Sequence, residues 1–247
     1  MAILEVKNLK KRYAKSEVFA VDDVSFSIDK GEIFALIGSN GAGKTTTLRM
    51  ISTLLEISDG SVTVNGYDVV KQPEKVRECI TYLPDEAGAY KNMTGLQYLK
   101  FMAGMFSTDK NIINGYVQTA IEMSTLKDRI NDKIATYSRG MIRKLLLSRA
   151  VMNKPKLAIL DEATSGLDVI NALDIRKMIK NLAHNEGMSF LLSSHNMLEI
   201  EFVSDKVGIM AQGHLKVIGT PQDLKNRYNA TNLEEIFERV VKNNEIL

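Results

Sequence analysis

A glycine-rich stretch from residue 38 to residue 45, Gly-Ser-Asn-Gly-Ala-Gly-Lys-Thr, has the residue types and spacing of a phosphate-binding turn. It fits the pattern G-x-x-x-x-G-K-[ST], in which glycines let consecutive backbone N–H groups turn toward phosphates. In that pattern the lysine reaches the β and γ phosphates, and the hydroxyl that follows it holds Mg²⁺. We therefore predict a nucleoside triphosphate site, with Lys44 also serving the reaction and Thr45 also binding the metal. The predicted nucleotide-binding residues of this stretch are Gly38, Ser39, Asn40, Gly41, Ala42, Gly43, Lys44, Thr45 and Thr46.

Two adjacent acids provide a second chemical signal. An apolar run at residues 157–160, Leu-Ala-Ile-Leu, leads directly into Asp161 and Glu162. A carboxylate at the end of a buried strand can complete the Mg²⁺ shell that Thr45 begins, and its neighbour can polarise a water in line with the γ phosphate. We predict Asp161 as a metal ligand and Glu162 as a catalytic residue.

The segments around these residues have the structure that such chemistry requires. Residues 32–37 form an apolar run of strand length, and residues 44–52 can begin a helix. A helix N-terminus suits an anion because its N–H groups are free and its dipole is positive there. Strand, glycine-rich turn and helix in this order favour phosphate binding over an ordinary turn.

The rest of the chain predicts an α/β protein whose strands and helices alternate after the glycine-rich stretch. Residues 3–6 and 18–28 alternate apolar and polar residues as antiparallel strands do, and a strand at 61–64 ends in an Asn-Gly turn. Residues 94–124 have apolar residues at helical spacing, with a capping box formed by Thr94 and Gln97. Further expected elements are a helix at 73–78, a strand at 80–83, helices at 138–151 and 169–184, a strand at 188–193, and a hairpin at 207–218.

These elements predict a P-loop NTPase (RecA-like) core with a parallel sheet, an antiparallel β subdomain and an inserted all-helical subdomain. We place one domain at residues 1–228, in which the catalytic core comprises 1–85 and 152–228 and the helical subdomain comprises 86–151. Residues 229–247 form a C-terminal helical tail, in which Thr231 and Glu234 make a second capping box.

Composition limits the possible partners. The chain has 32 basic and 30 acidic residues, and a net charge of +2 gives no general field for binding nucleic acid. One cysteine, Cys79, excludes an intrachain disulfide and favours a reducing compartment. No window reaches the roughly 18 to 20 uncharged apolar residues of a membrane span, and the first residues do not form a signal peptide. If the protein works at a membrane, another chain is expected to span it.

In this order the motifs resemble those of the ATP-binding subunits of ABC transporters, over nearly the whole chain. The glycine-rich stretch corresponds to the family's Walker A motif, residues 157–162 to Walker B with its catalytic glutamate, and residues 165–168, Ser-Gly-Leu-Asp, to the D-loop. Residues 137–141, Tyr-Ser-Arg-Gly-Met, stand in the place of the signature. His195 stands in the place of the switch histidine, and Tyr13 matches the aromatic residue that stacks on adenine.

The resemblance implies that ATP and Mg²⁺ are the cofactors and that two such domains face each other head to tail. Each ATP would then lie between the phosphate loop of one chain and Ser138 and Gly140 of the other, at a helix start that suits a γ phosphate. His195 would contact the γ phosphate as a catalytic residue, and Asp168 would connect the two sites. The expected partners are one or two separate transmembrane subunits and a second ATP-binding subunit, identical or related. Nucleic acid is not expected as a partner. We expect a cytoplasmic protein, peripheral on the inner face of the cell membrane, that contacts the membrane only through its partner.

Departures from the family pattern indicate a subtype. Most members read Leu-Ser-Gly-Gly-Gln at the signature, whereas this chain has Arg139 and Met141, and Asp85 stands where a glutamine is usual. Asp85 is therefore predicted as a nucleotide-site and metal residue with a shorter, charged side chain. Together with the tail sequence at residues 232–237, these features resemble the ATPases of type-2 ABC exporters, a group with sodium-extruding and drug- or peptide-resistance pumps.

Other interpretations stay open at this point. A soluble ABC-type ATPase that remodels nucleic acid or a protein complex is the alternative function, although no long coiled coil separates the motifs and the chain has one cassette. A third interpretation is a regulatory module that binds ATP without hydrolysing it, but the presence of Glu162 and His195 disfavours it. Tyr13 could be an ordinary strand tyrosine, and residues 85–105 are the candidate contact surface for a membrane partner. The basic residues Arg139, Arg143, Lys144 and Arg149 are interpreted as one solvated helix face.

Overall fold

Parallel strands form the centre of the molecule, as the apolar runs predict. The computed structural model describes residues 2–14 and 16–242, and six strands pair in the order β10-β9-β3-β8-β7-β6. Neighbouring strands from β9 to β6 run parallel, and every residue of β3 and β7 is buried. The five parallel strands are β3 (Ile33–Ile37), β6 (Ile80–Leu83), β7 (Leu157–Asp161), β8 (Ser189–Ser194) and β9 (Lys206–Ala211).

The register of these strands brings their carboxyl ends to one edge. Ile37 pairs with Ser194, and Asp161 pairs with Ser193, so β3, β7 and β8 end side by side. The glycine-rich turn follows β3 directly, His195 follows β8, and of the two acids Asp161 ends β7 and Glu162 comes next. One edge of the sheet therefore carries most of the predicted chemistry.

The hairpin predicted at residues 207–218 extends this sheet. β10 (His214–Gly219) pairs antiparallel with β9 through Gln212 and Gly213, which have positive φ angles of 52° and 81°. Because β9 also pairs with β3, the hairpin is the edge of the main sheet and not a separate terminal unit.

A second, antiparallel sheet has the order β2-β1-β4-β5 and confirms the predicted β subdomain. Asn65 and Gly66, with φ angles of 50° and 84°, form the two-residue turn between its last two strands, as this dipeptide favours. Helix α1 (Lys44–Ile51) shares one buried apolar cluster with both sheets. The strands are β1 (Ala2–Arg12), β2 (Phe19–Asp29), β4 (Asp59–Val64) and β5 (Tyr67–Asp68).

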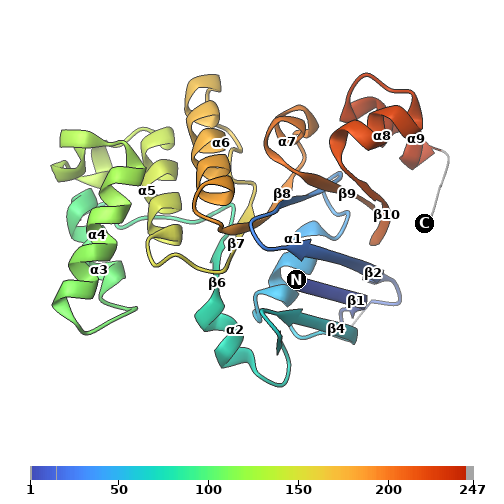
Figure 1. Cartoon of the computed structure of the whole chain (residues 1–247), viewed down its shortest axis with the longest axis horizontal. Coiled ribbons are helices and arrows are strands. Elements are labelled where there is room, and N and C mark those ends of the chain that lie inside the picture. Colours follow the sequence, from blue (N-terminus) through green and yellow to red (C-terminus); the bar gives the residue numbers. More distant parts are fainter. Residues whose placement is uncertain (1, 15, 243–247) are drawn as a thin grey trace.

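Helices gather at one side of the sheet, on the left of Figure 1. Thr94 caps the first of them, and its capping box with Gln97 is confirmed. The helices are α3 (Gly95–Ala103), α4 (Lys110–Ser124), the 3-10 turns η1 (Lys127–Asn131) and η2 (Ile134–Thr136), and α5 (Arg139–Val151). They confirm the fold class, a P-loop NTPase fold with a helical insertion, while the exact subdomain boundaries stay a prediction. The other helices in this part of the chain are α2 (Pro73–Cys79), α6 (Val169–His184) and α7 (Met197–Val203).

In the C-terminal tail, α9 (Leu233–Lys242) packs against α7 and against α8 (Pro221–Tyr228), the helix that precedes the tail. Leu233, Ile236 and Val240 of α9 are buried in the main apolar cluster, so the tail helix is docked on the core. The capping box predicted for Thr231 and Glu234 is wrong by one position. The Glu235 carboxylate accepts hydrogen bonds from the N–H and the hydroxyl of Thr231. The N–H of Glu235 donates to the side chain of Asn232, so Asn232 and not Thr231 caps the helix. Residues 243–247 of the predicted tail lie outside the described residues. Within residues 2–14 and 16–242, no helix has the length and apolar character needed to cross a membrane.

Candidate functional site

The turn between β3 and α1 needs its glycines. Gly43 caps α1 with a φ of 103°, and a Cβ there would lie 2.6 Å from the carbonyl oxygen of Ala20. A Cβ on Gly38 would lie 2.3 Å from the carbonyl oxygen of Met210. Real Cβ atoms do not come so close to backbone, so only glycine fits at either position. The turn is thus shaped by the antiparallel sheet on one side and by β9 on the other.

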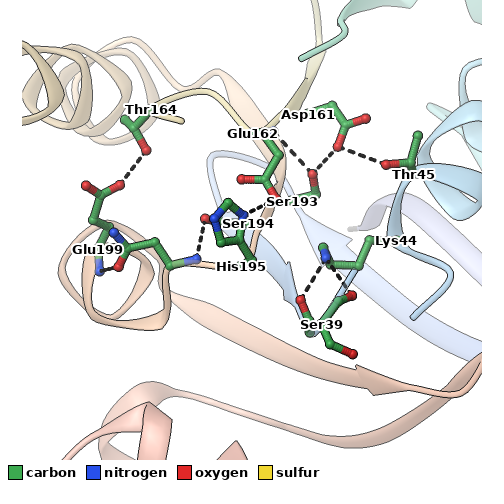
Figure 2. Close-up of polar contacts among 12 residues, drawn as sticks. Ser39, Lys44, Thr45, Asp161, Glu162, Thr164, Ser193, Ser194, His195 and Glu199 are labelled. Atoms are coloured by element: carbon green, nitrogen blue, oxygen red, sulfur yellow. Dashed lines mark hydrogen bonds and ion pairs between the residues drawn. The ribbon is translucent and has the colours of Figure 1, made fainter. Parts of the chain in front are cut away.

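Lys44 lies inside this turn, and its side chain is buried. Its Nζ donates to the carbonyl oxygens of Gly38 at 2.7 Å and Ser39 at 3.1 Å (Figure 2). Burial lowers the pKa of Lys44, and the nearby charges of Glu162 and Asp161 act in the opposite direction. An amine held by carbonyls next to two carboxylates is in place to bind a phosphate.

Asp161 lies at the end of β7, almost fully buried, and accepts hydrogen bonds from three hydroxyls, of which those of Thr45 and Ser193 appear in Figure 2. Thr45 Oγ1 donates to Asp161 Oδ1 at 3.3 Å, the Ser193 hydroxyl donates to the same oxygen, and Tyr82 OH donates to Oδ2 at 3.4 Å. Burial, and then the charge of Asp161, raise the pKa of Tyr82, so this phenol stays a donor. The structure therefore brings together the two oxygens that were predicted to hold Mg²⁺.

Glu162 has an uncommon backbone conformation. Its φ of 50° is left-handed, a region that residues with a Cβ occupy rarely and that costs on the order of 1–3 kcal/mol. Its N–H donates to the carbonyl oxygen of Ser193 at 3.1 Å and to Ser193 Oγ at 3.3 Å. Its carboxylate, 13% exposed, lies 2.9 Å from Nδ1 of His195, whose ring is about half exposed. The turned backbone presents the carboxylate at the sheet edge and brings two of the three predicted catalytic side chains, Glu162 and His195, into contact.

A cavity of about 260 Å³ joins the glycine-rich turn to these acids. Tyr13 lines a neighbouring hollow with Arg12 and Phe19, and its hydroxyl is 3.4 Å from Thr46 Oγ1 at the border of the two. The predicted residues that line the 260 Å³ cavity are Asn40, Gly41, Ala42, Gly43, Lys44, Thr45, Thr46, Asp85, Asp161 and Glu162, and Ala20 joins them.

Three predicted site residues lie elsewhere. Ser138 caps α5, and its Oγ accepts the N–H of Met141. Gly140 packs on the side chain of Asn171, where a Cβ would lie 2.5 Å away. Asp168 caps α6, and hydrogen bonds from the N–H and side chain of Asn171 hold its pKa below the usual value. Among the described residues that line the cavity, none of these three is present.

Arg143 corrects the interpretation of the basic residues on α5. Its side chain is 7% exposed and is therefore not part of a solvated face. Lys144 beside it forms an ion pair with Asp174 at 2.7 Å. The helix has buried apolar residues three and four positions after Arg143, at Leu146 and Leu147, and this spacing is the sequence signal that places position 143 on the inner face. Burial lowers the pKa of Arg143, but an arginine keeps its charge in proteins.

Ser193 is a second residue that motif reading passes over. It lies at the end of a buried strand, and its hydroxyl serves both Asp161 and the N–H of Glu162. Its sequence signal is a polar residue at the carboxyl end of a parallel strand, where ligands bind in such sheets.

The arrangement fits a nucleoside triphosphate with Mg²⁺. Glycines leave room for phosphates at the turn, and a lysine amine and a helix N-terminus face that space. Thr45 and Asp161 supply a neighbouring pair of oxygens. Mg²⁺ takes few protein ligands and completes its shell with water and phosphate.

Comparisons with known proteins point the same way. A family model described as "ABC transporter" matches residues 21–165. The linearmycin resistance ATP-binding protein LnrL of Bacillus subtilis is 38% identical over 91% of this chain and 71% of its own length. The ABC transporter ATP-binding protein NatA of the same organism is 35% identical over 90% of this chain and 91% of its own. A solved structure described as the ATP-binding subunit of an ABC transporter superposes with a TM-score of 0.84, at 29% identity, over 97% of this chain and 99% of that one.

Proposed function

Because the chain belongs to the ABC transporter family as an ATP-binding subunit and ATPase that uses ATP and Mg²⁺, we propose that it powers export through a separate membrane subunit. The observation that carries the proposal for the site is the meeting of Lys44, Thr45, Asp161 and Glu162 at one cavity. These four residues come from a turn, a helix start and a strand end, and they divide phosphate binding, metal binding and water activation among them.

We assign one role to each side chain at this cavity. Lys44 stabilises phosphate charge, and Thr45 and Asp161 hold Mg²⁺ together with Asp85. Bound Mg²⁺ neutralises charge on the phosphate oxygens during transfer. Glu162 accepts a proton from the attacking water, and the contact between its carboxylate and His195 Nδ1 at 2.9 Å keeps it oriented. Tyr13, beside Thr46 in the adjoining hollow, stacks on the adenine.

The site is completed by a second ATP-binding subunit. Ser138, Gly140 and Asp168 do not line the cavity of their own chain. Ser138 nevertheless begins a 13-residue helix, whose positive end suits a phosphate. We assign these residues to the ATP of a facing chain, identical or related, so that ATP holds the pair together and hydrolysis releases it.

The surface for the membrane subunit lies on and around α3. Five large apolar residues there are exposed, and Met105 at the end of the helix is 62% exposed. Tyr90 packs edge-on against Phe101, which extends the apolar surface beyond the helix. Exposed apolar patches of this kind mark interaction sites. Met93, Met102 and Met123 pack instead against the core, so of these methionines only Met105 belongs to this patch. The exposed residues of the patch are Tyr90, Phe101, Met105, Phe106 and Ile112.

Attachment through such a partner places the protein on the cytoplasmic side of the cell membrane. The name of LnrL, a linearmycin resistance protein, supports the exporter subtype. The substrate pathway itself lies in the membrane subunit.

Affinity purification tests this proposal. The tagged chain is purified from native membranes in mild detergent, and the proteins that accompany it are identified by mass spectrometry. We expect a polytopic membrane protein. Met105→Glu, in the apolar patch, should lose this partner, and Leu54→Glu, an equally exposed apolar residue after α1, should retain it. Recovery of soluble partners alone, with the chain absent from membranes, would instead favour a soluble ATPase that remodels other molecules.

A further inference from the structure

We propose that Arg143 is a positioning residue that fixes the backbone on both sides of Glu162 and ties it to the start of α5. The proposal rests on the catalytic role proposed above for Glu162. Arg143 does not line the cavity and would act through other residues.

The guanidinium of Arg143 makes hydrogen bonds to five backbone carbonyls. Nη2 donates to Asp161 at 2.9 Å and to Glu162 at 2.8 Å, and Nε donates to Ala163 at 2.8 Å. Three consecutive peptide units around the proposed base are thus bound to one side chain. Nη1 donates to the carbonyl oxygens of Asp85 at 3.1 Å and Pro84 at 3.3 Å. The same side chain therefore also holds the loop that carries the proposed metal residue Asp85.

These hydrogen bonds hold the backbone at a residue whose conformation is energetically unfavourable. Glu162 is left-handed, and on its amino side the N–H donates to the carbonyl oxygen and hydroxyl of Ser193. On its carboxyl side the carbonyl accepts from Arg143 Nη2 at 2.8 Å and from the N–H of Ser165 at 3.1 Å. Strained conformations persist only when their surroundings over-determine them. Ser193 and Arg143 together provide that determination, one from β8 and one from α5.

Arginine is the side chain suited to this task. Its planar guanidinium offers five N–H donors in a fixed fork, whereas a lysine amine offers three around one point. Removing the guanidinium would take one hydrogen bond from each of these five carbonyls, although those of Glu162 and Pro84 also accept from the N–H groups of Ser165 and Ala87. A displacement of about 1 Å at a catalytic group can cost about 10²-fold in rate.

The contact also links Glu162 to the segment that starts α5. Arg143 lies five positions after Ser138, within the same helix. One turn earlier, the Arg139 guanidinium lies against Gly166, where a Cβ would be 2.2 Å from Nη1. Two arginines of α5 thus contact the loop that runs from Asp161 to Gly166. A shift of α5 relative to β7 would therefore displace the backbone of Glu162 through these two side chains.

The test separates positioning from binding and from folding. Arg143→Met is compared with Lys144→Met, which removes a neighbouring charge of the same helix that pairs with Asp174. We expect Arg143→Met to lower kcat by about 10²-fold, with the Kd for ATP within a few-fold of wild type, and Lys144→Met to keep kcat. A folded Arg143→Met variant with wild-type kcat, or one whose loss appears only in Kd, would overturn the proposal.

Chemical rescue provides a second measurement that a purely structural role would not move. In Arg143→Ala, added methylguanidinium should raise kcat severalfold, while the same addition leaves Lys144→Ala unchanged. Arg143→Lys should stay slow because one amine cannot serve two loops. If Arg143→Met does not fold, the other two variants decide. The positioning role of Arg143 is refuted if methylguanidinium does not raise kcat in Arg143→Ala and Arg143→Lys has the wild-type rate. A normal rate of ATP hydrolysis in Glu162→Gln would show that Glu162 is not the base. A normal rate in Arg143→Met, with Glu162→Gln slow, would refute only the positioning role of Arg143.

Discussion

Replacing Glu162 with glutamine removes one negative charge from the proposed site and little else. The side chain keeps its size, and the glutamine amide can still hydrogen-bond with His195 Nδ1, which lies 2.9 Å from the carboxylate. What is lost is the ability to accept a proton from water. A positioned general base contributes typically 10²–10⁴-fold, so turnover should fall by at least about 10²-fold, equivalent to about 2.7 kcal/mol in activation free energy.

The affinity of the Glu162→Gln variant for ATP should equal or exceed that of wild type. The Glu162 carboxylate lines the cavity where phosphates are proposed to bind, and like charges repel. Its removal relieves this repulsion, while Lys44 keeps its carbonyl contacts to Gly38 and Ser39. The expected signature is therefore a large fall in kcat with a Kd equal to or below that of wild type.

Phosphate release at saturating ATP measures the first quantity, and titration with a fluorescent ATP analogue measures the second. Glu199→Gln is the matched control, because its carboxylate lies nearby, bound to Thr164, but does not line the cavity (Figure 2). The control should hydrolyse ATP within a few-fold of wild type. A wild-type rate for Glu162→Gln, or an equal loss in both variants, would refute the assignment of Glu162 as base.

Three further predictions follow from the packing and the charges. Gly43→Ala should abolish ATP binding, since its Cβ would meet the Ala20 carbonyl, whereas Gly41→Ala, whose Cβ meets no described atom within 4 Å, should weaken binding less when both are titrated with nucleotide. Ile236→Ala should lower the free energy of unfolding by about 2–5 kcal/mol in urea melts, because this side chain is fully buried between α9 and the core. The lowered pKa of Asp168 means that its carboxylate stabilises the fold above the ordinary value of 3.8 and loses this effect as pH falls through the folded-state pKa. Asp168→Asn, which keeps the helix cap, should therefore have a flatter acid-side stability profile, as measured by thermal melts across pH.

Sequence reasoning succeeded where the cause is local. The apolar runs at β3 and β7 fill strands buried on both faces, and Asn65-Gly66 fits a turn that needs two positive φ angles. The glycine-rich stretch is constrained by phosphate geometry, so residue type and spacing identify it alone. The predicted family, the fold class and the ATPase activity are confirmed. The roles assigned to individual site residues stay predictions.

Errors arose where the cause lies far along the chain. Arg143 was read as solvated because a basic residue on a helix usually is. Its partners are carbonyls 18 to 20 and 58 to 59 positions away, which helical spacing does not reveal. The hairpin of β9 and β10 was predicted from its local pattern, but its place at the edge of the main sheet depends on pairing of β9 with β3, about 170 residues earlier. At the tail, the helix cap lies one residue later than predicted, because the side chain of Asn232 and not that of Thr231 accepts the N–H three positions on.

The backbone at Glu162 shows why such distant contacts matter for catalysis. Nothing in the residues Asp-Glu-Ala specifies a left-handed glutamate, and glutamate has no intrinsic preference for it. The conformation depends on Ser193, which parallel pairing places opposite Asp161, and on Arg143 from a helix that begins at the signature position. A one-residue slip of β8 would remove the first support, and a displaced α5 would remove the second. The direction of the proposed base is therefore set jointly by sheet register and helix position, so a mutation in either element can lower turnover without touching ATP.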